Sequence, residues 1–128
     1  MPLPTRASAG LADYFFGVFR SDTDRLVGAV SLFDVIRDSF QAAWIGYSVD
    51  QEHNGRGYAT QAVQLVTAYG FSDLKLHRLE AGVMPRNATS IRVLEKAGYV
   101  KEGLMRRNMY VNGQWEDHWH FAIVNPRD

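Results

Sequence analysis

Two glycines near the middle of the chain lie in a heptapeptide whose residue types suit the binding of a bulky anion. The heptapeptide reads Asn54-Gly55-Arg56-Gly57-Tyr58-Ala59-Thr60, and a helical pattern begins at its tyrosine. Gly55 and Gly57 carry no side chain that would keep an anion away from the backbone. The N–H groups of a first helical turn lack partners within the helix and form the positive end of its dipole. The segment therefore predicts a cradle for a diphosphate at the start of a helix.

The heptapeptide fits nucleotide-binding motifs poorly and a plain turn well. The Gly-Lys-Ser/Thr ending of a P-loop is absent, and Thr60 stands where a dinucleotide fingerprint has its third glycine. A dinucleotide fold would also begin at its first strand-to-helix turn, whereas several strand patterns precede this one. A tight turn without a ligand accounts for the two glycines equally well. Arg56 either adds charge beside the anion or is an ordinary solvated side chain.

A second group of polar residues opens a shorter helical pattern. Asn87 precedes this pattern as a good N-cap, and its side-chain amide also has the donors and the acceptor that a ligand amide needs. The two roles are compatible, because a side chain at the start of a helix faces outward. Ser90 follows at the third helical position, where a hydroxyl group either bonds a free backbone group or serves as a proton donor.

Short runs of aromatic and β-branched residues predict three strands in the first part of the chain. The runs span residues 14–19, 26–33 and 42–49, and turn-rich segments such as Ser21-Asp22-Thr23-Asp24 separate them. This order is typical of an antiparallel meander. A fourth strand over residues 78–83 alternates apolar and polar side chains, and Pro85 stops it.

Two helices and a terminal hairpin complete the pattern. Apolar residues three or four apart between Tyr58 and Gly70 predict a helix packed on the sheet, and a second helix runs from Asn87 to Gly98, which suits a left-handed C′ position. The type I′ turn signal Val111-Asn112-Gly113-Gln114 joins strands over 104–110 and 115–124. The predicted fold is an α+β domain in the order β-β-β-α-β-α-β-β. On the last strand we expect a core face of Trp115, Trp119, Phe121 and Ile123.

Length and composition set the class of protein. A chain of 128 residues is one ordinary domain, and its formal net charge of zero gives no electrostatic reason to expect a nucleic acid or an anionic membrane as partner. There is no cysteine, which excludes disulfides, thiolate nucleophiles and cysteine metal sites. No stretch of about twenty apolar residues appears, and no signal-like start is present. We therefore expect a single domain over residues 1–128 in the cytoplasm.

Four spaced blocks of sequence are more specific together than the glycine loop is alone. They are Gly46-Tyr47-Ser48-Val49, Gly55-Arg56-Gly57-Tyr58-Ala59-Thr60, Asn87-Ala88-Thr89-Ser90 and Glu95-Lys96-Ala97-Gly98-Tyr99. In this combination the chain resembles the GNAT superfamily over almost its whole length, and within it the branch of RimJ and RimL, the ribosomal-protein N-terminal acetyltransferases. The resemblance implies a mixed, mostly antiparallel twisted sheet with helices packed on it.

The resemblance also implies a ligand and a role for particular residues. The loop over residues 54–60 and the start of its helix would bind the pyrophosphate of coenzyme A, with acetyl-CoA as the co-substrate. The strand over Tyr47, Ser48 and Val49 would splay from its neighbour, so that pantetheine amides pair with its free edge. Asn87 matches a residue that holds the pantetheine arm, and Ser90 matches a position near the thioester sulfur.

Several positions depart from the family pattern. Asn54 stands where glutamine or arginine is usual, and Gln61 where glutamate is frequent, but neither change prevents binding by backbone amides. RimL-like enzymes place a catalytic glutamate directly before the tyrosine that matches Tyr110, and this chain has Met109 there. The usual general base is therefore missing. Candidate replacements, of which we assign none, are Asp117, His118 and His120.

The missing base matters less for some acceptors than for others. A lysine side chain has a pKa of about 10.4, so the neutral amine costs roughly 4.6 kcal/mol at about pH 7. An α-amine with a pKa of about 7.8 costs only about 1.1 kcal/mol, and water alone can remove its proton. The sequence therefore favours an N-terminal α-amine where no strong base is available.

The start of the chain is short in comparison with the family. Family members have another strand and one or two helices before the segment that matches residues 14–19, and here only residues 1–13 precede it. That part usually forms one wall of the acceptor pocket. We expect either a truncated start or a partner chain, such as the second copy in a homodimer, that supplies the wall.

These observations predict an acetyl-CoA-dependent N-acetyltransferase. The transfer would go directly to a primary amine, either a protein N-terminal α-amine or a small-molecule amine, with Ser90 as proton donor and a backbone amide near Val49 for the oxyanion. Two histidines without a carboxylate or a third histidine at suitable spacing are a poor metal-binding pattern, and no metal is expected. The alternative is a coenzyme A-binding module without catalysis, motivated by Met109 and the short start.

Overall fold

The protein forms one mixed sheet with two helices, and the computed structural model describes residues 5–8, 11–49 and 57–128. The strands are β1 (Thr5–Ser8), β2 (Leu11–Phe19), β3 (Leu26–Ile36), β4 (Ala42–Val49), β5 (Arg78–Val83), β6 (Val100–Val111) and β7 (Gln114–Val124). The helices are α1 (Tyr58–Ser72) and α2 (Ala88–Lys96). The described strands lie in the order β1-β2-β3-β4-β5-β7-β6.

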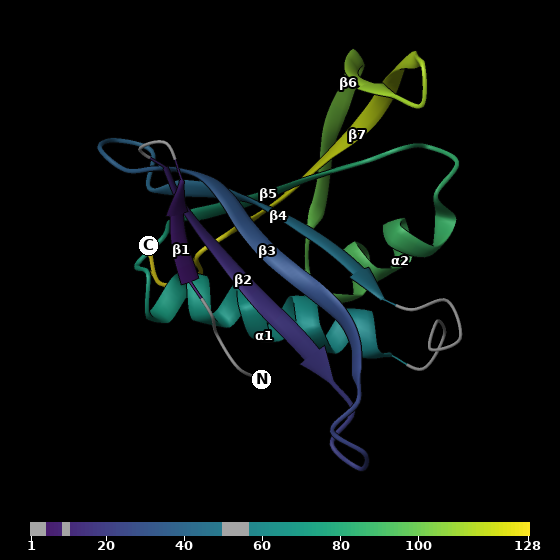
Figure 1. The fold of residues 1–128 in the computed structure, drawn as a ribbon. Coiled ribbons are helices and arrows are strands. Elements are labelled where there is room, and N and C mark those ends of the chain that lie inside the picture. Colours follow the sequence, from purple (N-terminus) through teal and green to yellow (C-terminus); the bar gives the residue numbers. More distant parts are fainter. Residues whose placement is uncertain (1–4, 9–10, 50–56) are drawn as a thin grey trace.

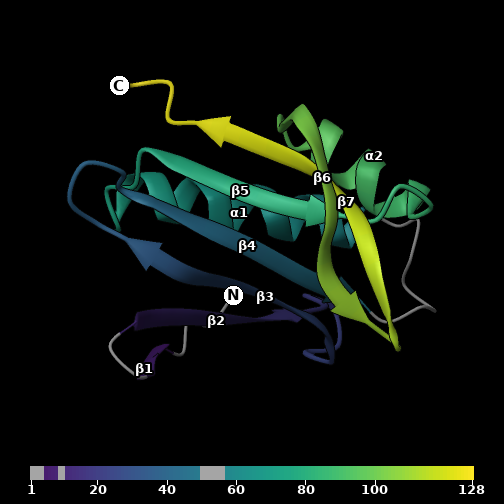
Figure 2. The same ribbon diagram turned by 90° about the horizontal axis from the view of Figure 1, so that it is seen from above.

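All neighbouring strands in this sheet are antiparallel except for β4 and β5, which run parallel. Both helices lie on the same face of the sheet, with α1 running along it and α2 beside one end of β5 (Figures 1 and 2). Within the described residues no helix covers the opposite face. The predicted α+β class and the predicted element order are confirmed.

The structure differs from the predicted elements in the first strands and in β6, which begins at Val100, four residues before the predicted start at residue 104. A short strand, β1, was not predicted, and it pairs with the start of β2. β2 begins at Leu11 and β3 ends at Ile36, so each is three residues longer than the aromatic and β-branched runs indicated. Backbone pairing with neighbours extends these strands beyond the residues whose side chains favour them.

The hydrophobic core lies between the sheet and α1. Its fully buried side chains come from every layer, including Phe16 and Leu32 from the meander, Val63 and Val66 from α1, and Phe121 from β7. Tyr99 enters the core from the start of the final hairpin, and its hydroxyl group lies 2.8 Å from Thr67 Oγ1 on α1. This hydrogen bond satisfies two buried hydroxyl groups and ties α1 to the segment after α2.

The hairpin and the helix end follow the predicted turn chemistry. Asn112 and Gly113 have φ values of 49° and 85°, as the type I′ turn requires, and Gly98 has a φ of 95° just beyond α2. The expected core face of β7 is right for Phe121 and for the partly buried Trp119 and Ile123. It is wrong for Trp115, which is 60% exposed and lies next to the hairpin turn. The hairpin end of β6 and β7 extends away from α1 (Figure 1).

The pairing of β3 with the end of β4 depends on a glycine. A Cβ atom at Gly28 would overlap with the carbonyl oxygen of Ser48, so the two strand backbones approach closely at this point. We expect Gly28→Ala to push β4 away and to lower the free energy of unfolding by about 1–3 kcal/mol. Gly103→Ala on β6 is the matched control, because a Cβ there meets nothing within 4 Å. Equal urea midpoints for the two variants would contradict this close approach.

Candidate functional site

The parallel pair of strands opens along its length. β4 and β5 are paired only where Ala42–Trp44 face Arg78–Glu80. Residues 45–49 of β4 pair with β3 on one edge, but within the described residues no strand pairs with their other edge. The two strands diverge from their paired ends (Figure 2). The splay that the family resemblance predicted at Tyr47, Ser48 and Val49 is therefore present, and free backbone groups on this edge can pair with an extended ligand.

A cleft of about 240 Å³ lies where β4 and β5 diverge. Residues from both strands, from α2 and from β7 line it, and they include Gly46, Tyr47, Gly82, Asn87, Ser90 and His118. Three of these, Tyr47, Asn87 and Ser90, were predicted from the sequence as site residues. The fold thus brings together residues that are more than 40 positions apart in the chain.

Tyr47 and Ser90 join the two sides of the cleft. The Tyr47 hydroxyl group lies 2.6 Å from Ser90 Oγ, and it also donates to the Ser90 carbonyl oxygen at 3.1 Å. Burial raises the pKa of Tyr47, and the hydrogen bond to Ser90 acts in the opposite direction. The phenol therefore stays protonated at neutral pH and can donate a hydrogen bond to the serine oxygen.

Asn87 carries out the predicted capping role and retains a free group. Its Oδ1 accepts a hydrogen bond from the backbone N–H of Ser90 at 3.1 Å. Its side-chain nitrogen has no hydrogen-bond partner among the described residues, so two donors remain for a ligand carbonyl. The two roles that the sequence left open are thus compatible in the structure.

The start of α1 belongs to the second element that the sequence predicted for binding, the diphosphate cradle over residues 54–60. Gly57 is its N-cap with a φ of 79°, no side chain caps the first turn, and no acidic residue occurs there. The backbone amides of Ala59 and Thr60 precede the first intrahelical bond, which runs from the Gln61 N–H to the Gly57 carbonyl oxygen. An anion is favoured at such a helix start. The predicted site residues Asn54, Gly55 and Arg56 lie outside the described residues.

Of the candidate replacements for the missing base, Asp117 has a structural role. Its Oδ1 accepts a hydrogen bond from the backbone N–H of Arg107 at 2.8 Å, within a β-bulge where Arg107 has a φ of 45°. Met109 lies directly opposite Glu116 on β7. The hydrogen bond from Arg86 holds the pKa of the Glu116 carboxyl below its usual range, which makes it a weak base. Neither acidic residue fits the role of the absent glutamate.

His120 is held in a polar network on the sheet face opposite the helices. Its Nε2 lies 2.7 Å from Glu80 Oε1, and its ring stacks on Trp44 with centroids 5.5 Å apart. Arg78 joins the same network through Glu80 and Glu102. His118, by contrast, is 5% exposed and lines the cleft. The structure therefore separates two histidines that the sequence placed on one strand face as equivalent candidates.

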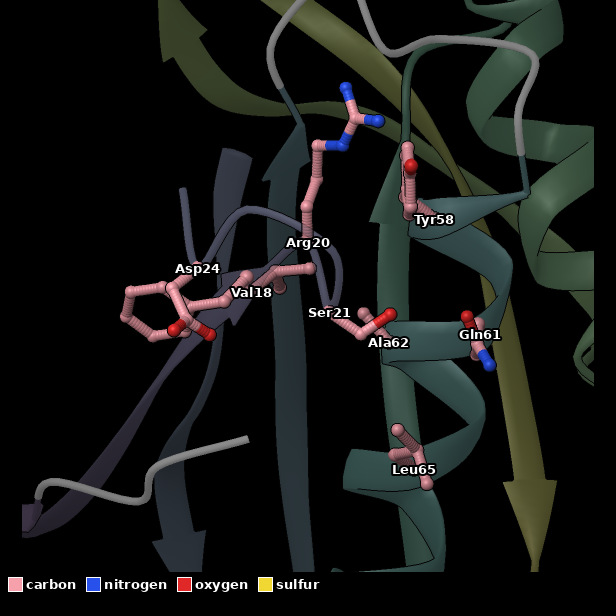
Figure 3. A pocket seen from close by; sticks show the side chains of 9 residues that line it. Val18, Arg20, Ser21, Asp24, Tyr58, Gln61, Ala62 and Leu65 are labelled. Atoms are coloured by element: carbon pink, nitrogen blue, oxygen red, sulfur yellow. The ribbon is translucent and has the colours of Figure 1, made fainter. Parts of the chain in front are cut away.

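A larger cavity lies elsewhere, between the turn after β2 and the first turns of α1. It has a volume of about 540 Å³, and Val18, Arg20, Ser21, Asp24, Gln61 and Leu65 are among its lining residues. Arg20, from the turn after β2, and Tyr58, at the start of α1, both line this cavity (Figure 3). Arg20 forms an ion pair with Asp22 at 2.7 Å. Tyr47, Asn87 and Ser90 line the smaller cleft and not this cavity, so these predicted site residues gather in the cleft.

The described ranges contain neither a metal-binding cluster nor a membrane-spanning helix. No group of three or more histidine and acidic side chains is placed there to hold a metal ion. No helix in the described part of the chain is long and apolar enough to cross a bilayer.

The sequence missed two contacts that the structure makes plain. Tyr47 was predicted only as part of the splayed strand, and its bond to Ser90 depends on packing across 43 residues. Asn108 was not singled out, although its side-chain amide lies 2.9 Å from His118 Nδ1. The bulge between Met105 and Met109 directs Asn108 to that ring, and bulges carry little sequence signal.

Comparison with known proteins identifies the family. The model of the acetyltransferase (GNAT) domain matches residues 5–100. A probable N-acetyltransferase of Bacillus subtilis, YjcK, is 59% identical over 116 residues, which are 91% of this chain and 64% of that protein. The chain thus spans less than two thirds of the length of this relative.

Solved structures agree with this comparison. The ribosomal-protein-S5-alanine acetyltransferase of Vibrio fischeri has a TM-score of 0.85 and 36% identity, covering 89% of this chain and 62% of that one. RimJ of Mycobacterium smegmatis in complex with CoA-disulfide has a TM-score of 0.82 and 34% identity, covering 92% and 55%. The resemblance to the GNAT superfamily and to its RimJ-like branch is confirmed.

The buried phenol in the cleft predicts a dependence of stability on pH. Below about pH 10 Tyr47 is protonated in both states, and there Tyr47→Phe should cost about 1 kcal/mol of unfolding free energy for the lost hydrogen bond. Above about pH 10 the phenol ionises in the unfolded chain before the folded one, because its folded pKa is raised, so the wild type loses stability. The Tyr47→Phe variant has no phenol at this position to ionise, so it does not lose unfolding free energy in this way.

Urea unfolding at about pH 8 and about pH 11 measures this effect. The stability difference between the wild type and Tyr47→Phe should narrow at the higher pH. Tyr110→Phe is the control, because that side chain is 63% exposed and lies outside the cleft. A Tyr47→Phe difference that is constant or grows with pH would contradict the assignment.

Proposed function

The chain belongs to the acetyltransferase (GNAT) family, and we propose that it transfers an acetyl group from acetyl-CoA directly to a primary amine. The observation that carries this proposal is the free edge of β4 in a cleft that also holds the Tyr47–Ser90 pair. An extended ligand with amide groups can pair with the strand edge while its end reaches the two hydroxyl groups. Pantetheine with a thioester at its end has this form.

The described residues fit coenzyme A at three places. Backbone groups of Tyr47, Ser48 and Val49 on the unpaired edge would pair with the pantetheine amides. The free side-chain nitrogen of Asn87 would donate to a pantetheine carbonyl. The backbone amides of Ala59 and Thr60 in the first turn of α1, which no side chain caps, would receive the pyrophosphate. RimJ of M. smegmatis, which shares this fold, has been solved with CoA-disulfide, which supports the assignment.

The mechanism needs one attack and one proton donor. The amine nitrogen attacks the acyl carbon, and the carbon–sulfur bond breaks as the amide forms. Ser90 gives its hydroxyl proton to the departing sulfur, and the proton lost by the amine restores the hydroxyl group through water. Tyr47 supports the step, because its hydrogen can turn from the Ser90 carbonyl oxygen to Ser90 Oγ. A backbone amide near Val49 stabilises the negative charge on the carbonyl oxygen.

The acceptor is proposed to be an α-amine at a protein N-terminus. None of Asp117, Glu116 and Met109 provides a base, and an α-amine loses its proton far more readily near neutral pH than a lysine side chain does. The V. fischeri relative is named for acetylation of an alanine of ribosomal protein S5, which agrees with this acceptor class. The homodimer that the sequence suggested as the source of a missing wall stays a prediction.

Release of the free thiol tests the activity directly. The protein is incubated with acetyl-CoA and, separately, N-terminal peptides, arylamines and polyamines. We expect peptide α-amines to be acetylated most rapidly, and Ser90→Ala to lower kcat by about 10²–10³-fold with little change in KM. Ser72→Ala, at the end of α1, is the control. Tight acetyl-CoA binding without turnover on any amine would instead support the binding module.

Binding of coenzyme A can be tested at the helix start. Gly57 has a φ of 79°, and a Cβ there meets no described atom within 4 Å, so Gly57→Val strains the backbone locally and places a side chain where the anion would approach. We expect coenzyme A affinity to fall at least tenfold by calorimetry. Gly113→Val is matched, because Gly113 has a φ of 85° with equally open space but lies in the hairpin turn. Equal affinities for the two variants would refute the pyrophosphate site.

A further inference from the structure

His118 is a buried polar side chain with one unused nitrogen. The residue is 5% exposed and lines the cleft where β4 and β5 diverge. Both of its hydrogen-bond contacts involve Nδ1. Its Nε2 has no hydrogen-bond partner among the described residues. A buried ring nitrogen without a partner is costly, so the cleft is built for a ligand that supplies one.

The Asn108 side chain determines which ring nitrogen carries the proton. With its amide nitrogen facing the ring, Asn108 lies 2.9 Å from His118 Nδ1, 3.1 Å from the Glu116 carbonyl oxygen and 3.2 Å from the Met105 carbonyl oxygen. The opposite orientation would set Oδ1 against two backbone carbonyl oxygens. Only the first orientation satisfies the amide, and in it Asn108 donates to Nδ1. The proton of the neutral ring is then on Nε2.

One contact favours the tautomer of His118 that carries its proton on Nδ1. The Glu116 carbonyl oxygen lies 3.2 Å from His118 Nδ1 and would accept a hydrogen bond if that nitrogen carried the proton. The same oxygen already accepts from Asn108 at 3.1 Å in the satisfied orientation. Moving the proton to Nδ1 would gain this one longer bond and would place two donors, the ring N–H and the Asn108 amide, against each other. The Nε2–H tautomer is therefore the more stable one.

The position of Asn108 is itself built into the fold. The register of β6 against β7 shifts between Met105 and Met109, and Arg107 within this bulge has a φ of 45°. The Asp117 carboxylate accepts the Arg107 backbone N–H at 2.8 Å and stabilises this strained turn. A bulge of this kind redirects a side chain. Here it directs Asn108 at the ring of His118.

We propose that His118 donates a hydrogen bond from Nε2–H to the acyl carbonyl oxygen of the bound thioester. This hydrogen bond becomes stronger as negative charge develops on the oxygen. The proposal rests on the proposed acetyl transfer. No proton is transferred by this group: the carbonyl oxygen accepts a hydrogen bond, and the bonds that form and break are those of the amide and the thioester. In this role His118 complements the backbone amide near Val49 from the other side of the cleft. Asn108 is a positioning residue that acts through His118.

The tautomer can be measured without any turnover. Long-range nitrogen–proton NMR spectra of protein labelled with nitrogen-15 distinguish a protonated Nε2 from a protonated Nδ1. We expect Nδ1 of His118 to show the shift of an unprotonated ring nitrogen in the wild type. In Asn108→Asp the carboxylate accepts from the ring, so the proton should move to Nδ1. A wild-type spectrum with the proton on Nδ1 would overturn the proposal.

The contact with the ligand is tested by the infrared band of acetyl-CoA labelled with carbon-13 at the carbonyl. A hydrogen bond to the carbonyl oxygen lowers the frequency of this band on binding. The lowering should be lost in His118→Ala and retained in His118→Gln, whose amide nitrogen can occupy the place of Nε2. His120→Gln is the control, because that ring bonds Glu80 and does not line the cleft. An unchanged band in His118→Ala would refute the contact.

Kinetics then separate a donor from a base. A donor predicts that His118→Gln keeps kcat within about tenfold of the wild type, whereas His118→Ala loses about 10²–10³-fold. If His118 instead acted as a general base, both variants should lose kcat equally, because glutamine accepts no proton. That result would overturn the proposal. If the wild type itself shows no transfer to any amine, the proposed function fails, while the tautomer and the infrared band still test the assignment of His118.

Discussion

The early end of the pairing between β4 and β5 is the constraint on which the site depends. Only Ala42–Trp44 and Arg78–Glu80 are in register, and beyond them β4 continues with one edge unpaired by any described strand. An unpaired parallel edge inside a sheet leaves backbone donors and acceptors that need partners. A ligand with its own amide groups satisfies this need, and the same gap admits side chains from both faces of the sheet. The proposed binding of coenzyme A and the proposed acetyl transfer thus depend on one structural feature.

The rest of the fold maintains this gap. β3 holds β4 from the other side through Gly28, whose lack of a side chain permits the close approach to Ser48. β7 continues the sheet beyond β5 over six residue pairs and holds β5 on the edge that faces away from β4. The Tyr47–Ser90 bond then links β4 to α2 across the cleft. The cleft is open because its two walls are each anchored elsewhere.

The elements could be predicted well from the sequence because their signals are local. Side-chain alternation, helical spacing, the N-cap Asn87 and the turn at Asn112 and Gly113 each depend on a few neighbouring residues. The short strand β1 and the extra residues of β2, β3 and β6 were missed because backbone pairing, and not side-chain type, forms them. Trp115 was placed in the core because alternation gives the face of a residue but not how far the covering helix extends.

The candidate site was predictable only in part, because sequence signals are local and the roles of several site residues depend on distant partners. Tyr47, Asn87 and Ser90 were found through motifs, and the structure brings them to one cleft. No local pattern distinguishes Asp117, His118 and His120, since all three lie within four residues on one strand. Their roles depend on distant partners: a bulge for Asp117, Glu80 for His120, and Asn108 for His118.

These partners also bear on the absence of the glutamate that the family has where this chain has Met109. The bulge in β6 that ends at Met109 presents Asn108 to His118, so the strand that lacks the family's acid supports a different polar group at the cleft. An amide that donates to Nδ1 keeps the ring from accepting a proton there, which suits hydrogen-bond donation and not base catalysis. With the donor that we propose at His118 and no base assigned, the proposed site favours an acceptor that is already largely neutral. An α-amine meets that requirement at a lower cost than a lysine side chain does.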